Sequence, residues 1–495
     1  MNSVVAEISG LGGLDWGIVG AAVVLLFVIS YIFGREERDT NDFFLGGRRV
    51  PAVVACLSFV ATEISALTIV SIPAKAYEEN WRFLQFLVGL AFARVVVAFL
   101  FIPAFYKYNC TSIYEFLRHR FGPATQYAGS AFFFVTRLIA SGVRLYATCM
   151  AVGIIMGWPL RATIALFTVV SIAFIAFGGI KAVVWAGAYQ AVFFLVAGIV
   201  VAGFLISHID GGFAAVVKTA GDAGRLSTFH FTFGLKDAST FWAWLAAGFF
   251  IGLVSFGTDQ EMVQRLLTVE TRKSSQKTII ATILTALPVY WLYLAVGTLL
   301  FVFYSQNPLL SLPDKMKEIL PHFTRTVLPA GLKGLVLGAI VMASIDSPLS
   351  SLTSSFVSDF YRPLIRRGAS ERHYLLVSRI GVVGFGLVLG AIAFACAPVE
   401  KILDFAFQIL SITGGPLLGV FLLGLLTRRK ANFANIPAML VGAGVCLVLM
   451  LMIYAKMIDL GWTWLIVIGT AITFGLAYLC GPAYPGPKAE TETKE

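Results

Sequence analysis

Apolar runs of about 17 to 25 residues, the length that crosses the hydrocarbon core of a bilayer as a helix, recur along this chain from Trp16 to Leu479. A segment in lipid must satisfy its own backbone hydrogen bonds, which restricts spanning chains to helices and closed barrels. Only 13% of the residues are charged, whereas a soluble domain carries about 25%. We therefore predict an all-α membrane protein.

The apolar runs predict about thirteen transmembrane helices in a single domain over residues 1–486, followed by a polar cytoplasmic tail over 487–495. With the N-terminus outside, every basic doublet falls on the cytoplasmic side, as the positive-inside rule requires. This bias accounts for the net charge of +10 without a nucleic-acid partner. The prediction is a multi-pass protein of the plasma (inner) membrane. Its spans lie at about 16–33, 52–76, 82–106, 127–157, 160–177, 182–206, 241–264, 278–305, 328–360, 374–397, 402–427, 435–455 and 462–479.

Two polar interruptions stand out within these spans. The stretch ATEIS (61–65) places the carboxylate of Glu63 at mid-span, which costs at least ~2.5 kcal/mol unless a partner or cavity offsets it. The stretch SFGTDQEMVQR (255–265) interrupts the seventh span. Paired interruptions at corresponding positions of two halves are typical of inverted-repeat transporters, with the ligand site near the midplane. The simpler alternative is a kink or a helix end, and it explains the second stretch equally well.

The ninth span is rich in hydroxyl residues over 340–355, IVMASIDSPLSSLTSS. Small hydroxyl residues let membrane helices approach closely, and this explains the later serines. It does not explain Asp346. Because hard cations prefer oxygen ligands, we predict a cation site between residues 61–65 and the start of this serine run.

Several further motifs occur in order along nearly the whole chain: DFFLGGRRVP (42–51), SIPAKAY (71–77), TSIYEFLRHRFG (111–122), FGGIKAVVWAGAYQ (177–190), GTDQEMVQR (257–265) and GGPLLGVFLLG (414–424). With these motifs the sequence resembles the sodium/solute symporters, which include sodium-coupled sugar, proline, sialic acid and vitamin carriers, and it is similar to bacterial members.

The resemblance implies a leucine-transporter-type fold and sodium-driven uptake of a small polar organic solute by alternating access. A leading helix over 16–33 would precede two inverted five-helix repeats, over 52–206 and 241–427, with extra helices over 435–479. Na⁺ is the implied coupling ion, the lipid bilayer is the surrounding partner, and a monomer is the expected functional unit.

The resemblance also implies a set of sodium ligands. The family's main sodium site matches the carbonyls of Ala61, Ile64, Ile340 and Ala343 and the hydroxyl of Ser344. One family hydroxyl is missing, because the first residue of an adjacent serine pair is Ala343 in this chain.

A second departure concerns the fifth core helix. Some members carry an acid there that supports a second sodium, and this chain has Gly187 instead. Asp346 matches the position of a hydroxyl ligand of that second site. Our hypothesis is that Asp346, together with Ser347, binds a second cation or carries a proton.

Family solute contacts match residues at the first interruption and on two other helices. Arg144 lies one helical turn from Ala140, which aligns with the carboxylate-binding arginine of sialic acid carriers, and Gln260 comes from the second interruption. The predicted solute-binding residues are Glu63, Ser65, Thr68, Phe83, Gln85, Arg144, Gln260 and Gln408.

Whether the Glu63 carboxylate is free or paired decides which solutes the pocket can bind. Its candidate partners are the solute, sodium, Arg144 and Arg137. A free carboxylate favours a cationic or polyhydroxylated ligand and repels a monoanion, whereas a neutralised one allows a zwitterion or a sugar. We favour a neutral, hydroxyl-rich or zwitterionic solute, such as a sugar, sugar acid, amino acid or vitamin-like molecule.

Other classes of function have less support in the sequence. No nucleophile elbow, phosphate loop or metal-ligand histidine pair indicates an enzyme, so no catalytic residue is predicted. The alternative to sodium symport is a substrate-sensing or proton-coupled transporter-like membrane protein that uses Asp346 and Glu63.

The Ser344 hydroxyl offers a direct test of the predicted sodium site. Ser344→Ala removes one oxygen ligand, and we expect the apparent Na⁺ affinity of transport to fall about tenfold, the equivalent of roughly 1.4 kcal/mol. The measurement is solute uptake as a function of Na⁺ concentration, with Ser350→Ala as a control from the later part of the run. Unchanged sodium dependence in Ser344→Ala would refute this site.

Overall fold

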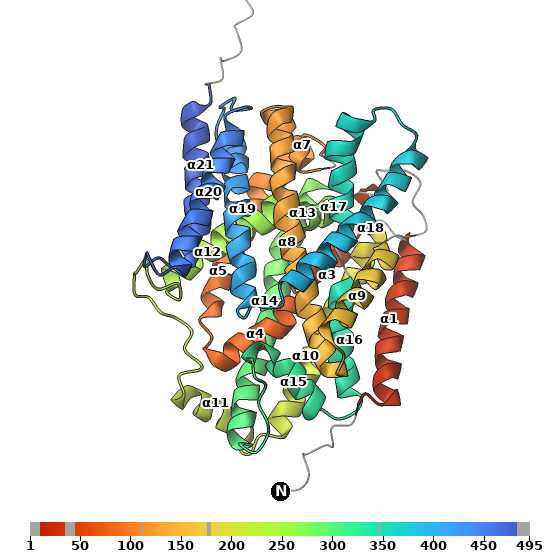
Figure 1. The fold of residues 1–495 in the computed structure, drawn as a ribbon, viewed down its shortest axis with the longest axis vertical. Coiled ribbons are helices and arrows are strands. Elements are labelled where there is room, and N and C mark those ends of the chain that lie inside the picture. The colour runs from red at the N-terminus through yellow and green to blue at the C-terminus, as the bar shows by residue number, and fades with distance from the viewer. Residues whose placement is uncertain (1–9, 35–44, 111, 176–179, 346–347, 483–495) are drawn as a thin grey trace, which may run out of the picture.

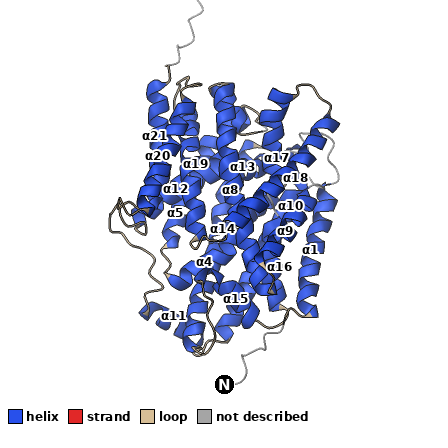
Figure 2. Cartoon of the chain, viewed as in Figure 1, coloured by secondary structure: helices blue, strands red, loops and turns tan. Residues whose placement is uncertain are grey.

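The computed structural model describes residues 10–34, 45–110, 112–175, 180–345 and 348–482. Helices run along the long axis of the molecule, and no strand occurs among these residues (Figure 2). In Figure 1 the helix α1 begins at the lower end and α21 ends at the upper end. The described chain thus starts and finishes at opposite ends of the bundle.

In the first half of the chain, α3 and α4 form one broken membrane span, whereas several other helices are continuous (Figure 1). Its helices are α1 (Gly13–Gly34), α3 (Ala52–Glu63), α4 (Ala66–Glu78), α5 (Phe83–Val96), α6 (Ile102–Lys107), α7 (Tyr114–Arg120), α8 (Pro123–Met156), α9 (Leu160–Ile175) and α10 (Ile180–Ser207). A π-helical turn over Val97–Phe101 joins α5 to α6.

The second half contains the other interrupted helix. Its helices are α11 (Gly212–Asp222), α12 (Phe241–Leu253), α13 (Gln260–Leu267), α14 (Arg272–Gln306), α15 (Ile319–Thr326), α16 (Leu332–Ile345), α17 (Leu349–Ser355), α18 (Glu371–Ala395), α19 (Ile402–Leu426), α20 (Asn435–Tyr454) and α21 (Leu465–Cys480). A wide π-helical segment, Phe356–Ile365, continues from α17.

Helix length and hydropathy support the predicted spans. In the described part of the chain, ten helices are long and apolar enough to cross a membrane, and the broken pair α3 and α4 raises this to eleven. Two shorter apolar stretches, Leu160–Ala173 and Leu332–Ala343, lie where the sequence predicts the remaining two spans. The all-α prediction is therefore confirmed.

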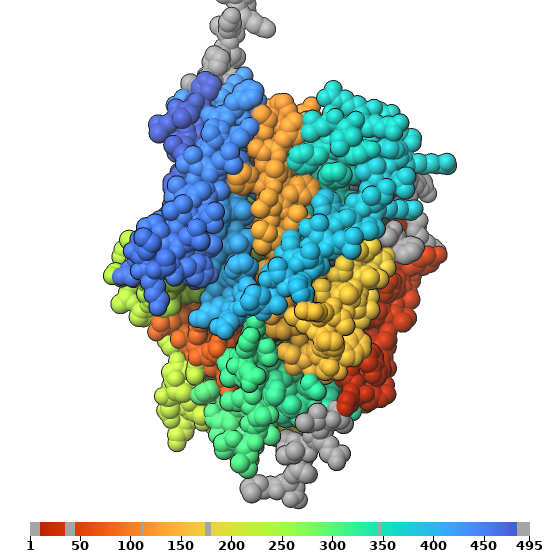
Figure 3. All heavy atoms as spheres, in the orientation of Figure 1, coloured from red at the N-terminus to blue at the C-terminus, as the bar shows by residue number. Residues whose placement is uncertain are grey.

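The outer surface of the bundle is apolar where the helices face away from the core. Val24, Phe27 and Val28 of α1 are more than 40% exposed, and so are Leu447 and Leu451 of α20. Figure 3 shows α1 and α18 on the surface of the bundle. Such large exposed apolar faces fit contact with lipid rather than water.

The first predicted interruption is a true break in the helix. α3 and α4 meet at an angle of 58°. Ile64 has φ −89° and ψ 78°, and Ser65 is extended with φ −85° and ψ 175°. The sequence places the break at 61–65, and the structure puts it at the last two of these residues.

The second interruption also breaks the helix, at Asp259. α12 loosens into a π-helical turn over Val254–Thr258, and Asp259 is extended with φ −99° and ψ 118°. The Asp259 carboxylate accepts a hydrogen bond from the Glu261 amide at 2.9 Å, which caps the new helix α13. The polar side chain of Asp259 thus satisfies a backbone amide at the start of α13.

Glycines bring the helices of the core together most closely at the crossing of α5 and α12. A Cβ atom built on Gly248 would collide with the Phe86 carbonyl oxygen, and one built on Gly89 would collide with the Leu245 carbonyl oxygen. Such backbone-to-backbone contact is possible only without a side chain, as in small-residue packing of membrane helices. This contact fixes α12 against the helix that follows the first break.

Gly248→Ala tests that contact. Because the added methyl group meets backbone rather than a movable side chain, we expect the free energy of unfolding to fall by about 1–3 kcal/mol. Thermal unfolding of the purified protein in detergent measures the effect. Gly203→Ala on α10 is the matched control, because nothing lies within 4 Å of its Cβ position. Equal stability of the two variants would contradict the described packing.

Candidate sodium and solute site

The break between α3 and α4 frees backbone carbonyl groups inside the protein. The Ile64 amide still bonds to the Val60 carbonyl at 2.8 Å, but the carbonyls that follow lose their helical donors, as at every helix end. Ala61 and Ile64 are 5% and 1% exposed. The Thr68 hydroxyl approaches the Glu63 carbonyl at 3.4 Å. The predicted sodium ligands of this segment therefore lie in buried, irregular backbone.

The other predicted sodium ligands lie on α16. Ile340 and Ala343 are buried, at 0% and 5% exposure, and α16 packs against α4 and α10. Gln190 of α10 donates to the Met342 carbonyl at 2.8 Å, which ties α10 to this part of α16. The side chain of Ser344 and residues Asp346 and Ser347 lie outside the described part, so their predicted roles remain predictions.

Glu63 has a partner that the sequence analysis did not name. Its carboxylate forms an ion pair with Arg94 of α5, and the two side chains are 6% and 4% exposed. The Tyr290 hydroxyl of α14 donates to the other carboxylate oxygen at 3.2 Å. Arg94, which is not among the candidate partners named above, thus pairs with Glu63, and Arg137 pairs instead with Asp259 and Glu261.

Arg94 is itself held in a fixed orientation. Its Nε donates to the Thr282 hydroxyl at 2.9 Å, and its guanidinium lies 4.3 Å from the centre of the Phe256 ring. The signal for this residue was present in the sequence, because an arginine within an apolar run is as costly as a glutamate and equally calls for a partner. Tyr290 and Thr282 carried no comparable signal.

Arg137 belongs to a different charge cluster, at the second break. It forms an ion pair with Asp259 at 3.0 Å and another with Glu261. Arg265 lies 3.8 Å from the Glu261 carboxylate and donates to the Glu261 carbonyl at 2.7 Å. All four side chains are at most 11% exposed. The cluster ties α8 to α13.

Gln260, a predicted solute contact, is bonded to the backbone beside this cluster. Its side-chain oxygen accepts a hydrogen bond from the Ile113 amide at 2.9 Å. The neighbouring Tyr114 hydroxyl donates to the Thr258 carbonyl at 2.9 Å. The second break and the start of α7 are thereby joined, and a solute contact of Gln260 stays a prediction.

Phe83 lies close to the first break. Its ring packs against those of Phe86, Trp244 and Tyr290, with centroid distances of 5.3, 5.9 and 6.1 Å. Because Tyr290 also bonds to Glu63, Phe83 and Glu63 share a neighbour. The structure thus brings together Glu63, Thr68 and Phe83 of the predicted solute set, and it places Ser65, 5% exposed, in the break itself.

Three other predicted solute contacts have their own environments. Gln85 bonds to the carbonyl of Ser239 and to the amide of His230. Gln408 of α19 accepts a hydrogen bond from the Tyr454 hydroxyl at 2.6 Å. Arg144 is half-buried on α8. These bonds do not test solute binding, which remains a prediction for all three residues.

Gly187, where the resemblance implies an acid in some members, packs closely against α3. A Cβ atom on Gly187 would lie 2.6 Å from the Ser58 hydroxyl oxygen, and Arg265 donates to the same oxygen at 3.2 Å. Gly187 and the Arg265 guanidinium therefore both lie beside the Ser58 hydroxyl. A second cation at this place stays a prediction.

Comparison with known proteins gives the same picture. The profile of the Sodium:solute symporter family matches residues 43–442. The sodium/sialic acid symporter of Aliivibrio fischeri is 31% identical over 97% of this chain and 95% of its own length. Human sodium-coupled monocarboxylate transporter 1 is 28% identical over 86% of this chain and 69% of its own length.

Among solved structures, the substrate-bound outward-open state of a Na⁺-coupled sialic acid symporter is similar in fold. It aligns with a TM-score of 0.84 and 28% identity over 96% of this chain and 99% of its own. The chain belongs to the sodium:solute symporter family. It is a multi-pass membrane protein that couples solute symport to Na⁺ and is not an enzyme.

The buried pair of Glu63 and Arg94 can be tested by removing one or both charges. Arg94→Gln leaves a buried carboxylate without its counter-charge, and we expect a loss of about 3–5 kcal/mol of stability. The double variant Glu63→Gln with Arg94→Gln should recover most of this loss. Thermal unfolding in detergent measures both.

Lys236→Gln serves as the control for that experiment, because its pair with Asp459 is exposed and should contribute little. If the double variant is less stable than Arg94→Gln alone, the two charges do not compensate each other, and the assignment of this pair is wrong.

Proposed function

We propose that the solute is a small zwitterionic or hydroxylated carboxylic acid that binds beside the break between α3 and α4. One observation carries the proposal: the only described charge at the break, Glu63, is neutralised by Arg94. A solute carboxylate therefore meets no uncompensated like charge, and Na⁺ on the freed carbonyls would attract it. Relatives named for sialic acid and for monocarboxylates support this chemistry.

The roles of the individual residues follow from their positions. The carbonyls of Ala61, Ile64, Ile340 and Ala343 would hold Na⁺, since peptide oxygens suit a hard cation. Ser344 would add its hydroxyl. The solute would lie between the freed backbone and the ring of Phe83, with hydrogen bonds from residues of the predicted solute set listed above.

Binding at a broken helix suits alternating access. Half-helices that meet at a site can tilt independently, so one body can rock against the other around the bound ion and solute. We further propose that the N-terminus lies outside and the C-terminus in the cytoplasm. The basic doublets, which fall in the predicted loops on one side of the spans, support this orientation.

Uptake into proteoliposomes tests the proposal. With an inward Na⁺ gradient we expect accumulation of at least one of N-acetylneuraminate, L-lactate and L-proline above the level reached with K⁺ in place of Na⁺. D-galactose is the uncharged control. Collapse of the gradient with a sodium ionophore should abolish accumulation. Sodium-driven uptake of galactose without uptake of any carboxylate would refute the proposed solute class.

Proton coupling is a second candidate, favoured by Asp346 in the serine-rich span and by Gly187 at the position where some family members carry an acid. In the same assay Asp346→Asn should alter either the cation-to-solute ratio or the pH dependence of uptake. If both remain as in the unmodified protein, Asp346 takes no part in coupling.

A further inference from the structure

A short segment between α11 and α12 exposes several large apolar side chains close together. This segment, residues 228–235 with the sequence TFHFTFGL, is called the aromatic segment below. Its residues Phe229, Phe231, Phe233 and Leu235 are 53%, 62%, 74% and 52% exposed. Figure 1 shows the chain between α11 and α12 on the outside of the bundle. Clustered apolar exposure of this kind marks a surface that contacts a protein partner or a membrane.

The exposed side chains of the segment lie on one side, and its backbone is bonded to the rest of the protein. Every second residue is apolar, which in extended chain places these side chains on the same side. The rings of Phe229 and Phe231 stack with their centroids 5.6 Å apart. Between them, the His230 amide donates to the Gln85 side chain at 3.0 Å, and the His230 carbonyl accepts from the Phe241 amide at 2.7 Å. The segment is thus held in place while its rings remain exposed.

The same hydrogen bonds fix the depth of the segment relative to the membrane. Besides the bonds of His230 to Gln85 and Phe241, the Leu235 carbonyl accepts from the Gly461 amide at 2.7 Å. These partners lie at the start of three candidate membrane spans, which begin at Phe83, Phe241 and Trp462. The aromatic segment therefore lies at the level where α5, α12 and α21 enter the hydrocarbon.

The exposed rings continue the apolar surface of a membrane-spanning helix. The Phe231 ring lies 4.9 Å from that of Phe241, which in turn packs edge-on against Trp242 of α12 at 5.2 Å. Trp242 is itself 45% exposed. At the other end of the segment, Lys236 pairs with Asp459 on the exposed surface. Aromatic rings bordered by charged groups suit the boundary between acyl chains and lipid headgroups.

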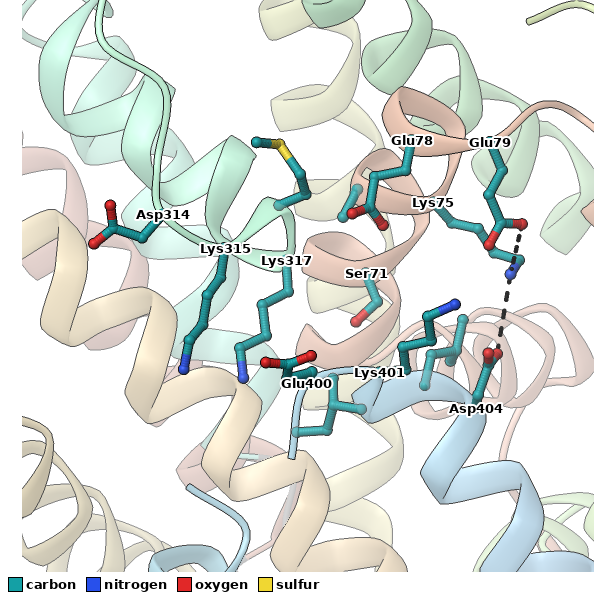
Figure 4. Close-up of a pocket in the computed structure, with 14 residues that line it drawn as sticks. Ser71, Lys75, Glu78, Glu79, Asp314, Lys315, Lys317, Glu400, Lys401 and Asp404 are labelled. Atoms are coloured by element: carbon teal, nitrogen blue, oxygen red, sulfur yellow. Dashed lines mark ion pairs between the residues drawn. The ribbon is translucent and has the colours of Figure 1, made fainter. Parts of the chain in front are cut away.

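The aromatic segment does not line the cavity at the end of α4. Figure 4 shows this cavity, which lies between α4, residues 314–317 and residues 400–404. None of the described residues that line it belongs to residues 228–235. The exposed rings therefore do not cover that cavity, and their partner lies elsewhere.

We propose that the aromatic segment inserts into the membrane interface, where lipid acyl chains cover Phe229, Phe231, Phe233 and Leu235. The segment then acts as an anchor for the α5 and α12 helices, because His230 bonds to the first turn of each. Lipid contact would hold the ends of these two helices at a fixed depth in the bilayer. The proposal does not depend on which solute is transported.

Spin labels on the full-length protein in liposomes of palmitoyl-oleoyl phosphatidylcholine test the proposal. Cys480→Ser first removes the exposed cysteine, and a label is then attached at Phe233→Cys. Because Phe233 is 74% exposed, its replacement leaves the packing intact. We expect the label to be more accessible to oxygen, which concentrates among acyl chains, than to the water-soluble nickel complex NiEDDA.

Two labelled variants provide the reference values. Leu447→Cys, on the exposed face of α20, is the lipid control, and Asp314→Cys, an exposed residue labelled in Figure 4, is the water control. The ratio of oxygen to NiEDDA accessibility at Phe233→Cys should lie between the two controls and above equality.

Two results would overturn the proposal. A ratio at Phe233→Cys as low as that of the water control would mean that the aromatic segment faces water. Low accessibility to both reagents would mean that protein covers the segment. Spin–spin broadening that disappears on dilution with unlabelled protein would then identify that cover as a second copy of this chain.

Discussion

The structure depends on one constraint: backbone that leaves a helix within a membrane must be enclosed by protein. At Ile64 and Ser65 the chain stops forming helical hydrogen bonds, and each uncompensated peptide group in lipid would cost several kcal/mol. α10, α14 and α16 pack around the broken pair, and every residue from Ile64 to Ser71 is buried. The protein that encloses the break offsets its cost. The same enclosure surrounds the freed backbone carbonyl oxygens, which suit a small hard cation.

Two clusters of charged groups in the interior lie at the two breaks. Glu63 and Arg94 lie at the first, and Arg137, Asp259, Glu261 and Arg265 lie at the second. In both clusters the charges come from different helices, so each pair also fixes how those helices sit relative to each other. Because removing one partner leaves an uncompensated buried charge, each pair opposes the separation of the helices that carry it.

Much of the fold was predictable because its signals are local. Apolar length locates the helices, and the cost of Glu63 in an apolar run locates the first break to within three residues. The partner of Glu63 was not predictable in this way, since Arg94 is 31 positions away and the choice between it, Arg137 and Arg144 depends on how the helices pack. Gln85 and Gln260 illustrate a second limit. The sequence cannot distinguish a glutamine side chain that contacts a solute from one that, as observed here, bonds to backbone groups of a neighbouring segment.

The cluster that ties α8 to α13 also bears on the order of events when that end of the molecule opens. Separating the two helices would strand Arg137 away from Asp259 and Glu261 in surroundings that solvate ions poorly. Water must therefore reach the cluster before the helices can part. Hydration of the cluster would thus precede the opening movement. The entry of water into this short stretch would then limit the rate at which that end opens.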